Sequence, residues 1–132
     1  MNGEYKEYYD TGQLYATCSY IDGILHGELI QYFRDKQLQP LSIIRAITTF
    51  KNGNLHGVRK QYHENGQIYS ICTFIDDQLN GESKKYDSNG QIQDSRSYID
   101  GRLNGEYKRY NLNGSLYETS MYENGKLISI KY

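Results

Sequence analysis

The chain has 132 residues and a formal net charge of −1, and hydrophobic residues make up 37% of it. This length fits a single domain, residues 1–132, and the low hydrophobic share argues against a thick central core. A nucleic-acid partner is also disfavoured, because proteins that bind nucleic acids normally carry a basic excess.

Tyrosine dominates the aromatic content, with 15 Tyr, three Phe and no Trp. A tyrosine ring can pack against neighbours while its hydroxyl stays in water. The composition therefore predicts a thin, ordered structure whose packing residues also lie near the surface.

The chain shows no sign of a membrane anchor or an export signal. No stretch reaches the roughly 18 consecutive apolar residues that a spanning helix needs, and no signal-like segment follows Met1. We expect either a cytoplasmic protein or one whose leader has been removed. Two cysteines, Cys18 and Cys72, do not make a disulfide framework.

One segment recurs along the whole chain, as GEYKEY from Gly3, YIDGILHGELIQY from Tyr20, FKNGNLHGVRKQY from Phe50, FIDDQLNGESKKY from Phe74, YIDGRLNGEYKRY from Tyr98 and YENGKLISIKY from Tyr122. Its anchoring glycines are Gly3, Gly27, Gly57, Gly81 and Gly105, spaced by 24 residues except for one spacing of 30. The spacing predicts five units that start near these glycines, the second with six extra residues.

Two turn signals alternate within the units. One set comprises Thr11-Gly12, Asn65-Gly66, Asn89-Gly90 and Asn113-Gly114; the other comprises Asp22-Gly23, Asn52-Gly53, Asp100-Gly101 and Asn124-Gly125, with Asp76-Asp77 as a degraded copy. Asn-Gly and Asp-Gly favour two-residue type I′ hairpin turns. The short intervals leave room for strands and none for helices, so we expect an antiparallel meander with two strands per unit.

The turns predict which residues lie opposite each other. The first set would pair Tyr62 with Tyr69, Tyr8 with Tyr15, Tyr110 with Tyr117 and Tyr86 with Gln93. The second set would pair Phe50 with Leu55, Tyr20 with Leu25, Phe74 with Leu79, Tyr98 with Leu103 and Tyr122 with Leu127, and it would place Gly105 opposite Arg96. Such aromatic pairs stabilise antiparallel strands.

Alternation along the strands separates two faces. The aromatic–leucine pairs fall on one face, which we expect to be packed. The other face carries a row of Glu4, Glu28, Glu82 and Glu106 and a row of Lys6, Lys60, Lys84 and Lys108. These rows fit either a solvated face of mixed charge or a lysine ladder that binds phosphate groups.

At these residues the sequence resembles the MORN-repeat family, in its bacterial and viral antitoxin-component variant. The core pattern is matched by Tyr20/Gly23/Gly27, Phe50/Gly53/Gly57, Tyr98/Gly101/Gly105 and, without its first glycine, Phe74/Gly81; the variant's added segment is matched by Gly105, Glu106, Tyr107, Lys108, Tyr110, Asn113, Gly114 and Leu116. The resemblance implies an all-β fold, an elongated single-layer antiparallel meander of about five 24-residue hairpin repeats. It also implies a scaffold for partners or for self-association, without catalytic residues.

The second unit departs from the pattern over residues 34–43, which include Leu38, Pro40 and Leu41. A long hairpin tip with apolar residues can form a binding surface that the other repeats lack. The alternative is a tolerated insertion that folds back over the sheet.

No residue pattern points to catalysis, a cofactor or a metal. His26 and His56 lie one unit apart, roughly 10 Å in a sheet, which is too far for shared zinc ligation. The later units carry Asn80 and Asn104 at this position, which indicates a polar role beside a turn. We therefore expect a protein that is not an enzyme and has no cofactor; a hydrolase remains a third possibility without a motif to support it.

The leading hypothesis is a scaffold that binds another protein, with antitoxin-like binding as the more specific form, or that binds itself through its sheet edges. Tyrosine supplies rigid contact area with little rotamer entropy to lose. The candidate partner-binding residues are Tyr8, Tyr15, Tyr62, Tyr69, Tyr110, Tyr117, Leu38, Pro40 and Leu41. The alternative is a module that associates with membranes or anionic lipid through Lys6, Lys60, Lys84 and Lys108.

Overall fold

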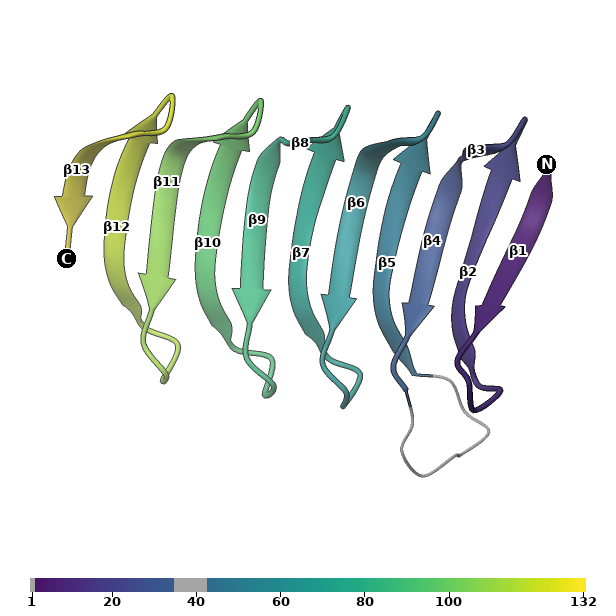
Figure 1. Cartoon of the computed structure of the whole chain (residues 1–132). Helices are drawn as coiled ribbons and strands as arrows, with labels where there is room; N and C mark the ends of the chain where they lie inside the picture. The colour runs from purple at the N-terminus through teal and green to yellow at the C-terminus, as the bar shows by residue number, and fades with distance from the viewer. Residues whose placement is uncertain (1, 35–42) are drawn as a thin grey trace.

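The computed structural model describes residues 2–34 and 43–132, and these form one antiparallel β-sheet (Figure 1). Its strands are β1 (Gly3–Tyr8), β2 (Leu14–Ile21), β3 (Ile24–Leu25), β4 (Gly27–Tyr32), β5 (Ile44–Lys51), β6 (Asn54–Tyr62), β7 (Ile68–Ile75), β8 (Gln78–Leu79), β9 (Gly81–Tyr86), β10 (Ile92–Ile99), β11 (Arg102–Tyr110), β12 (Leu116–Glu123) and β13 (Lys126–Lys131). The strands lie side by side in chain order, with short β3 and β8 added beside β2 and β7. The expected all-β meander is confirmed.

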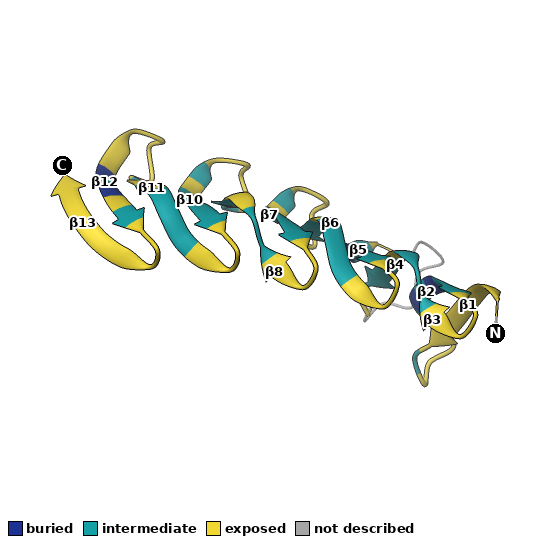
Figure 2. Ribbon diagram, turned by 90° about the horizontal axis from the view of Figure 1, so that it is seen from above, coloured by how far each residue is buried: buried dark blue, intermediate teal, exposed yellow. Residues whose placement is uncertain are grey.

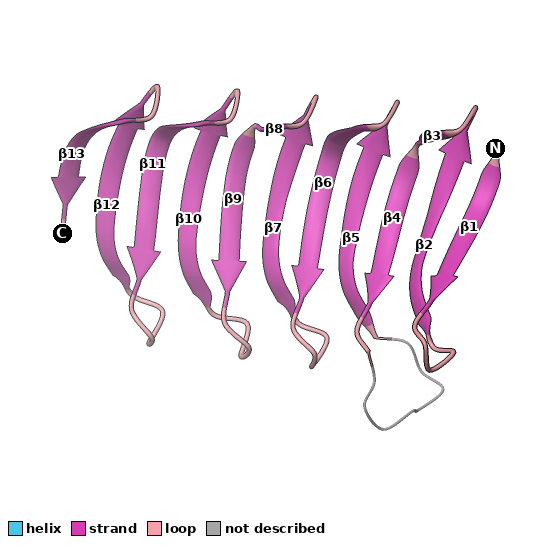
Figure 3. Ribbon diagram, viewed as in Figure 1, coloured by secondary structure: helices cyan, strands magenta, loops and turns pink. Residues whose placement is uncertain are grey.

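The described part of the chain contains no helix, and so no helix that could cross a membrane (Figure 3). The two ends of the chain lie at opposite ends of the row of strands (Figure 1). Seen from above, the hairpins follow one another in one layer, and most of the ribbon is half-buried or exposed (Figure 2). The sheet is therefore elongated and has no second layer of described residues packed on it.

The buried residues all belong to one face, which we call the inner face. They are Ala16, Cys18, Ala46, Thr48, Ser70, Tyr107, Glu118 and Ser120. Residues in register across antiparallel strands share a face, and Ala46 pairs with Gln31 on one side and with Gln61 on the other. Only 3% of Ala46 is exposed, because it is short and its two neighbours are long. The sheet thus shields small side chains with longer ones in the same layer.

The second set of turns has the expected geometry. Both central residues have positive φ in each of these turns, as in Asn52 (52°) and Gly53 (84°). The aromatic–leucine pairs follow, and Phe50 lies opposite Leu55 and Tyr98 opposite Leu103. Type I′ turns match the twist of the flanking strands, which fixes this register.

The first set of turns differs from the prediction. In the third unit the N–H of His63 donates to the Gln67 carbonyl (2.8 Å), and the Gly66 N–H donates to the His63 carbonyl (3.0 Å). Only Gly66 has positive φ, so the loop has three residues and ends on a left-handed glycine. The side-chain Oδ1 of Asn65 also accepts the Gln67 N–H, at 3.0 Å, and so closes a local turn.

This longer loop shifts the register, and the predicted tyrosine–tyrosine pairs are wrong. Tyr62 lies opposite Ile68, and Tyr69 is the extra residue of a β-bulge. The equivalent pairs are Tyr8 with Leu14, Tyr86 with Ile92 and Tyr110 with Leu116.

The predicted pairing of Gly105 with Arg96 is also wrong. Arg96 lies opposite Tyr107, and the register shifts between this pair and the Tyr98–Leu103 pair. Gly105 has φ of 102°, and a Cβ there would lie 3.3 Å from the Ser97 Cβ. Strand β11 therefore bends at a glycine that no larger residue could replace without strain.

Candidate interaction surface

The six candidate tyrosines lie along one long edge of the sheet, at the strand ends next to the three-residue loops, as three separate pairs in the first, third and fifth units. Three of them end strands β1, β6 and β11, and three lie near the start of β2, β7 and β12; they are Tyr8, Tyr62 and Tyr110, then Tyr15, Tyr69 and Tyr117. Tyr8, Tyr69 and Tyr117 are exposed (60%, 38% and 52%), and the other three are half-buried. The other three candidates, Leu38, Pro40 and Leu41, lie outside the described residues.

Ring contacts hold the second group of these tyrosines in place. The Tyr15 ring lies 5.0 Å from the Tyr9 ring, and the Tyr117 ring lies 6.0 Å from the Tyr132 ring, both edge-on. Tyr69 lies 5.2 Å from the ring of His63. Edge-to-face ring pairs at such distances are favourable, so the tyrosines have restricted orientations.

Side chains in the three-residue loops also join neighbouring units. The Tyr9 hydroxyl donates to the Tyr32 carbonyl (2.9 Å), and the Asn65 side-chain amide donates to the Ser88 carbonyl (2.7 Å). Arg34 pairs with Asp10 at 2.9 Å and lies 5.7 Å from the centre of the Tyr9 ring. These contacts tie the loops of the first and third units to the units that follow them.

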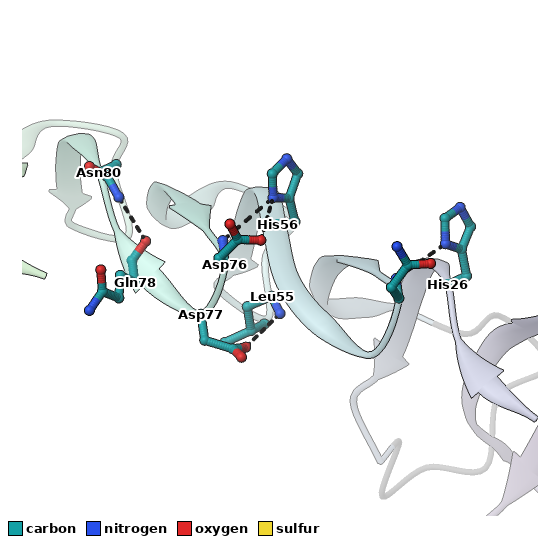
Figure 4. A network of polar contacts seen from close by, with 8 residues as sticks. His26, Leu55, His56, Asp76, Asp77, Gln78 and Asn80 are labelled. Atoms are coloured by element: carbon teal, nitrogen blue, oxygen red, sulfur yellow. Dashed lines mark hydrogen bonds and ion pairs between the residues drawn. The ribbon is translucent and has the colours of Figure 1, made fainter. Parts of the chain in front are cut away.

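A ladder of polar contacts joins the units along the opposite long edge of the sheet (Figure 4). The residue before each anchoring glycine accepts the N–H of the next unit's turn. The Asn80 Oδ1 accepts from Asp100 (2.9 Å) and the Asn104 Oδ1 from Asn124 (3.1 Å). The Nδ1 atoms of His26 and His56 accept from Asn52 (3.4 Å) and Asp76 (3.5 Å).

Backbone bonds run beside this ladder. From the second unit on, the second turn residue donates its N–H to the leucine carbonyl of the unit before it, as from Gly53 to Leu25 (2.8 Å) and from Gly101 to Leu79 (2.8 Å). The expected turn-flanking role of His26 and His56 is therefore confirmed. Their donors could not be identified from the sequence, because the contact joins two successive units.

The four lysines of the alternative hypothesis share one row on the face opposite the buried residues, which we call the outer face. The register links Lys60 to Lys84 through Ile71, and Lys84 to Lys108 through Ser95. Lys84 pairs with Glu82 at 3.3 Å and Lys108 with Glu106 at 3.0 Å. The hydrogen bond to Glu106 raises the pKa of Lys108. These glutamates offset part of the row's positive charge.

An arginine–tyrosine cluster on the inner face has no signal in the sequence. The Tyr107 ring lies 4.6 Å from the guanidinium of Arg96 and 4.9 Å from that of Arg109. Asp94 pairs with Arg96 (3.5 Å) and Glu118 with Arg109 (3.6 Å). Only the bend in β11 brings Arg96 opposite Tyr107, so turn spacing alone could not predict this cluster.

The part of the chain that the structure describes contains no group of three or more His, Cys, Asp or Glu residues arranged to hold a metal ion. Two hollows have volumes of about 240 Å³ and 450 Å³. The smaller is lined by Glu4, Thr17, Cys18, Ser19, Glu28 and Ile30, and neither hollow brings a histidine beside a serine or cysteine.

Sequence comparison identifies the repeats. The pattern of the MORN repeat variant matches residues 1–22, 55–76, 79–100 and 103–124, which together make up more than half of the chain. A comparison with curated proteins gave no significant match. The unmatched stretch between residues 22 and 55 contains most of the longer second unit. The chain belongs to the MORN repeat variant family.

Proposed function

We propose that this chain is a non-catalytic scaffold that binds another protein. The observation that carries the proposal is the single-layer sheet, which exposes long regular surfaces and carries three pairs of tyrosines along its loop edge. Aromatic residues with few rotamers contribute strongly to protein interfaces. We propose these tyrosines as the contact surface, and self-association through the sheet edges stays a prediction.

The experiment is a pull-down from the native host with the wild-type chain and with a triple variant Tyr8→Ala, Tyr69→Ala, Tyr117→Ala. We expect the variant to lose the partner, since these are the exposed members of the group. Tyr5→Ala is the control, because Tyr5 is an exposed tyrosine that lies on the inner face opposite Cys18. Equal capture by all three proteins would contradict the assigned surface.

One specific partner within this proposal is a toxic protein that the chain masks, and the antitoxin-type resemblance of the repeats supports it. Co-expression with a neighbouring toxic gene tests this partner. Growth rescue by the wild-type chain and not by the triple tyrosine variant is expected, whereas no rescue would leave only the general scaffold. We also propose a cytoplasmic location, which suits the free thiols of Cys18 and Cys72.

A second candidate function is binding to anionic lipid, and the shared row of Lys6, Lys60, Lys84 and Lys108 favours it. Sedimentation with vesicles rich in phosphatidylserine at low and moderate salt tests it. Binding that weakens with salt is expected if the row contacts lipid phosphates. No binding at low salt would remove this candidate.

A further inference from the structure

The repeats serve as an internal comparison for the outer face, and the second and third units differ from the rest. The lysine position reads Lys6, Ile30, Lys60, Lys84 and Lys108, and the glutamate position reads Glu4, Glu28, Val58, Glu82 and Glu106. The residue opposite the lysine position on the neighbouring strand is Thr17, Ile47, Ile71, Ser95 or Thr119 in the successive units. Four apolar residues thus replace charged or hydroxyl residues, and all four fall in two adjacent units.

The register places these four residues together, and we call them the outer-face patch: Ile30, Ile47, Val58 and Ile71. Ile30 lies opposite Ile47, Ile47 opposite Lys60, and Lys60 opposite Ile71, on neighbouring strands β4 to β7 (Figure 1). Val58 lies two residues before Lys60 on β6 and is 39% exposed; the other three are half-buried. Opposed side chains across strands approach within about 5 Å, so Ile30 and Ile47 adjoin each other, whereas Lys60 lies between Ile47 and Ile71.

Folding alone does not account for the patch. The first, fourth and fifth units form the same strands with Lys, Glu, Thr or Ser at these positions. β-Branched residues do favour strands, but that preference is no reason for four of them to cluster on one side of two units. Apolar side chains grouped on the outer surface of a sheet are typical of a contact surface.

The substitutions also leave one acid and one base without their usual partners. Ile30 stands where a lysine would pair with Glu28, and Val58 stands where a glutamate would pair with Lys60. The intact pairs in later units span 3.3 Å and 3.0 Å. Among the described residues, neither Glu28 nor Lys60 forms an ion pair. Glu28 lies on β4 and Lys60 on β6, with β5 of the patch between them.

We propose that the outer-face patch binds a second copy of this chain in a two-fold dimer. Glu28 of each copy faces Lys60 of the other, and Ile30, Ile47 and Val58 meet between the two ion pairs, with Ile71 at the margin. A two-fold interface uses the same surface twice and must therefore be self-complementary, which an apolar centre flanked by one acid and one base satisfies. The hollow of about 240 Å³ that Glu4, Glu28 and Ile30 help to line lies beside the patch and receives the Lys60 ammonium group of the second copy.

Size limits the strength of this dimer. A stable interface covers about 800 Å² on each partner, and four aliphatic side chains supply only part of such an area. The dimer is therefore a concentration-dependent one, and this inference does not depend on the identity of any other partner.

Analytical ultracentrifugation over a range of protein concentrations tests the proposal. Val58→Glu and Ile30→Lys install residues that other units already carry, so both variants are expected to fold. Each should raise the dimer dissociation constant at least about tenfold, since each places a charge in the apolar centre. A wild-type chain that is monomeric at every concentration would overturn the proposal.

A charge exchange distinguishes a second copy from any other contact. Glu28→Lys alone and Lys60→Glu alone each place like charges together in the dimer, so each variant should be monomeric. An equimolar mixture of the two should dimerise again, because each copy then meets opposite charges. Glu82→Lys and Lys84→Glu are the matched controls on the same face and should dimerise as the wild type does. A wild-type dimer that tolerates Val58→Glu, or a mixture that stays monomeric, would show that this face is not the interface.

Discussion

The residue before each anchoring glycine determines the length of a side-chain hydrogen bond between successive units. Asparagine at this position accepts the turn N–H at 2.9 Å and 3.1 Å, whereas histidine accepts it at 3.4 Å and 3.5 Å. Hydrogen bonds weaken as the donor and acceptor separate beyond about 3.2 Å. The units bounded by His26 and His56 are therefore joined by weaker side-chain contacts than the later ones.

Replacing these acceptors by alanine should reveal the difference. Asn80→Ala removes the acceptor of the Asp100 N–H, and we expect it to lower the free energy of unfolding by roughly 1 kcal/mol. His56→Ala should cost less, because its bond is longer. Urea unfolding measures both, and His56→Asn should equal or exceed the wild type in stability. Equal losses in the two alanine variants would contradict this ranking.

The reactivity of the Cys72 thiol reports on its surroundings on the inner face. Burial raises the pKa of Cys72, and the positive charge of Arg59, its cross-strand neighbour, partly opposes that effect. Because only the thiolate is alkylated, Cys72 should react with iodoacetamide more slowly in the folded chain than in urea at the same mildly alkaline pH. Arg59→Gln should slow the reaction further, and faster alkylation in that variant would contradict the assignment; a Cys18→Ser background isolates the signal.

The raised pKa of Cys72 also determines whether stability rises or falls with pH. The neutral thiol of Cys72 is favoured in the folded state, so its contribution is fully present below the unfolded pKa, about 8.5. Above that pH the unfolded chain loses its proton first, and the contribution is lost as the pH rises through the folded pKa. Cys72→Ser should therefore flatten the alkaline fall of stability measured by urea unfolding.

At the scale of the hairpin, the two turns show what local sequence can and cannot determine. The Asp-Gly and Asn-Gly turns of the second set, with an aromatic residue two positions before and a leucine two positions after, predicted their own register correctly. The Asn-Gly pairs of the first set fit either a two-residue loop or a three-residue loop. The structure has the longer loop, where Asn65 binds the Gln67 N–H, and the aromatic residues offered no means to exclude the shorter one.

The contacts between units were less predictable than the strands. The family resemblance and the turn spacing indicated the meander, because they depend on neighbouring residues. The Arg96–Tyr107 contact depends on where β11 bends, and the His56–Asp76 contact joins residues of successive units. The six candidate tyrosines flank the first set of turns as predicted, although the residues opposite them differ from the prediction.

The degraded turn Asp76-Asp77 provides a test at this scale. Asp77 has φ of 69°, which strains a residue that is not glycine, but its Oδ1 accepts the Leu55 N–H at 2.7 Å. Asp77→Gly relieves the strain and loses the bond, so the free energy of unfolding should change by less than about 1 kcal/mol. Asp77→Ala keeps the strain and loses the bond, so it should destabilise the chain by about 1–3 kcal/mol.

The control for this pair is Gly101→Ala in an intact turn. A Cβ at Gly101 would meet only the Gln78 side chain, at 3.8 Å, so its cost reports backbone strain alone. Urea unfolding of the three variants separates the two effects. An Asp77→Gly variant that is as unstable as Asp77→Ala would show that strain at this turn is negligible.

At the scale of the whole molecule, the main contacts join only strands that are adjacent in the sheet. Such an arrangement distributes stability along the row and provides no central core. The spacing of strands, about 4.8 Å, predicts roughly 48 Å between β1 and β13 at the two ends of the row.

Small-angle X-ray scattering of the Val58→Glu variant should show this elongation without interference from dimers. A compact domain of this length would have a radius of gyration of about 14 Å. We expect a larger value and a distance distribution with a long tail beyond about 50 Å. A symmetric distribution with a radius near 14 Å would contradict the single-layer sheet.

The polar ladder implies that the row of strands can be lengthened by whole units. The residue that ends each unit accepts a hydrogen bond from the turn of the next unit. If a duplicate of residues 81–104 were inserted after Asn104, the Asn104 side chain would accept the turn N–H of the duplicate. The duplicate's own final asparagine would then accept from Asn124. Unequal recombination between the gene's similar segments would thus yield intact proteins whose span differs in steps of roughly 10 Å.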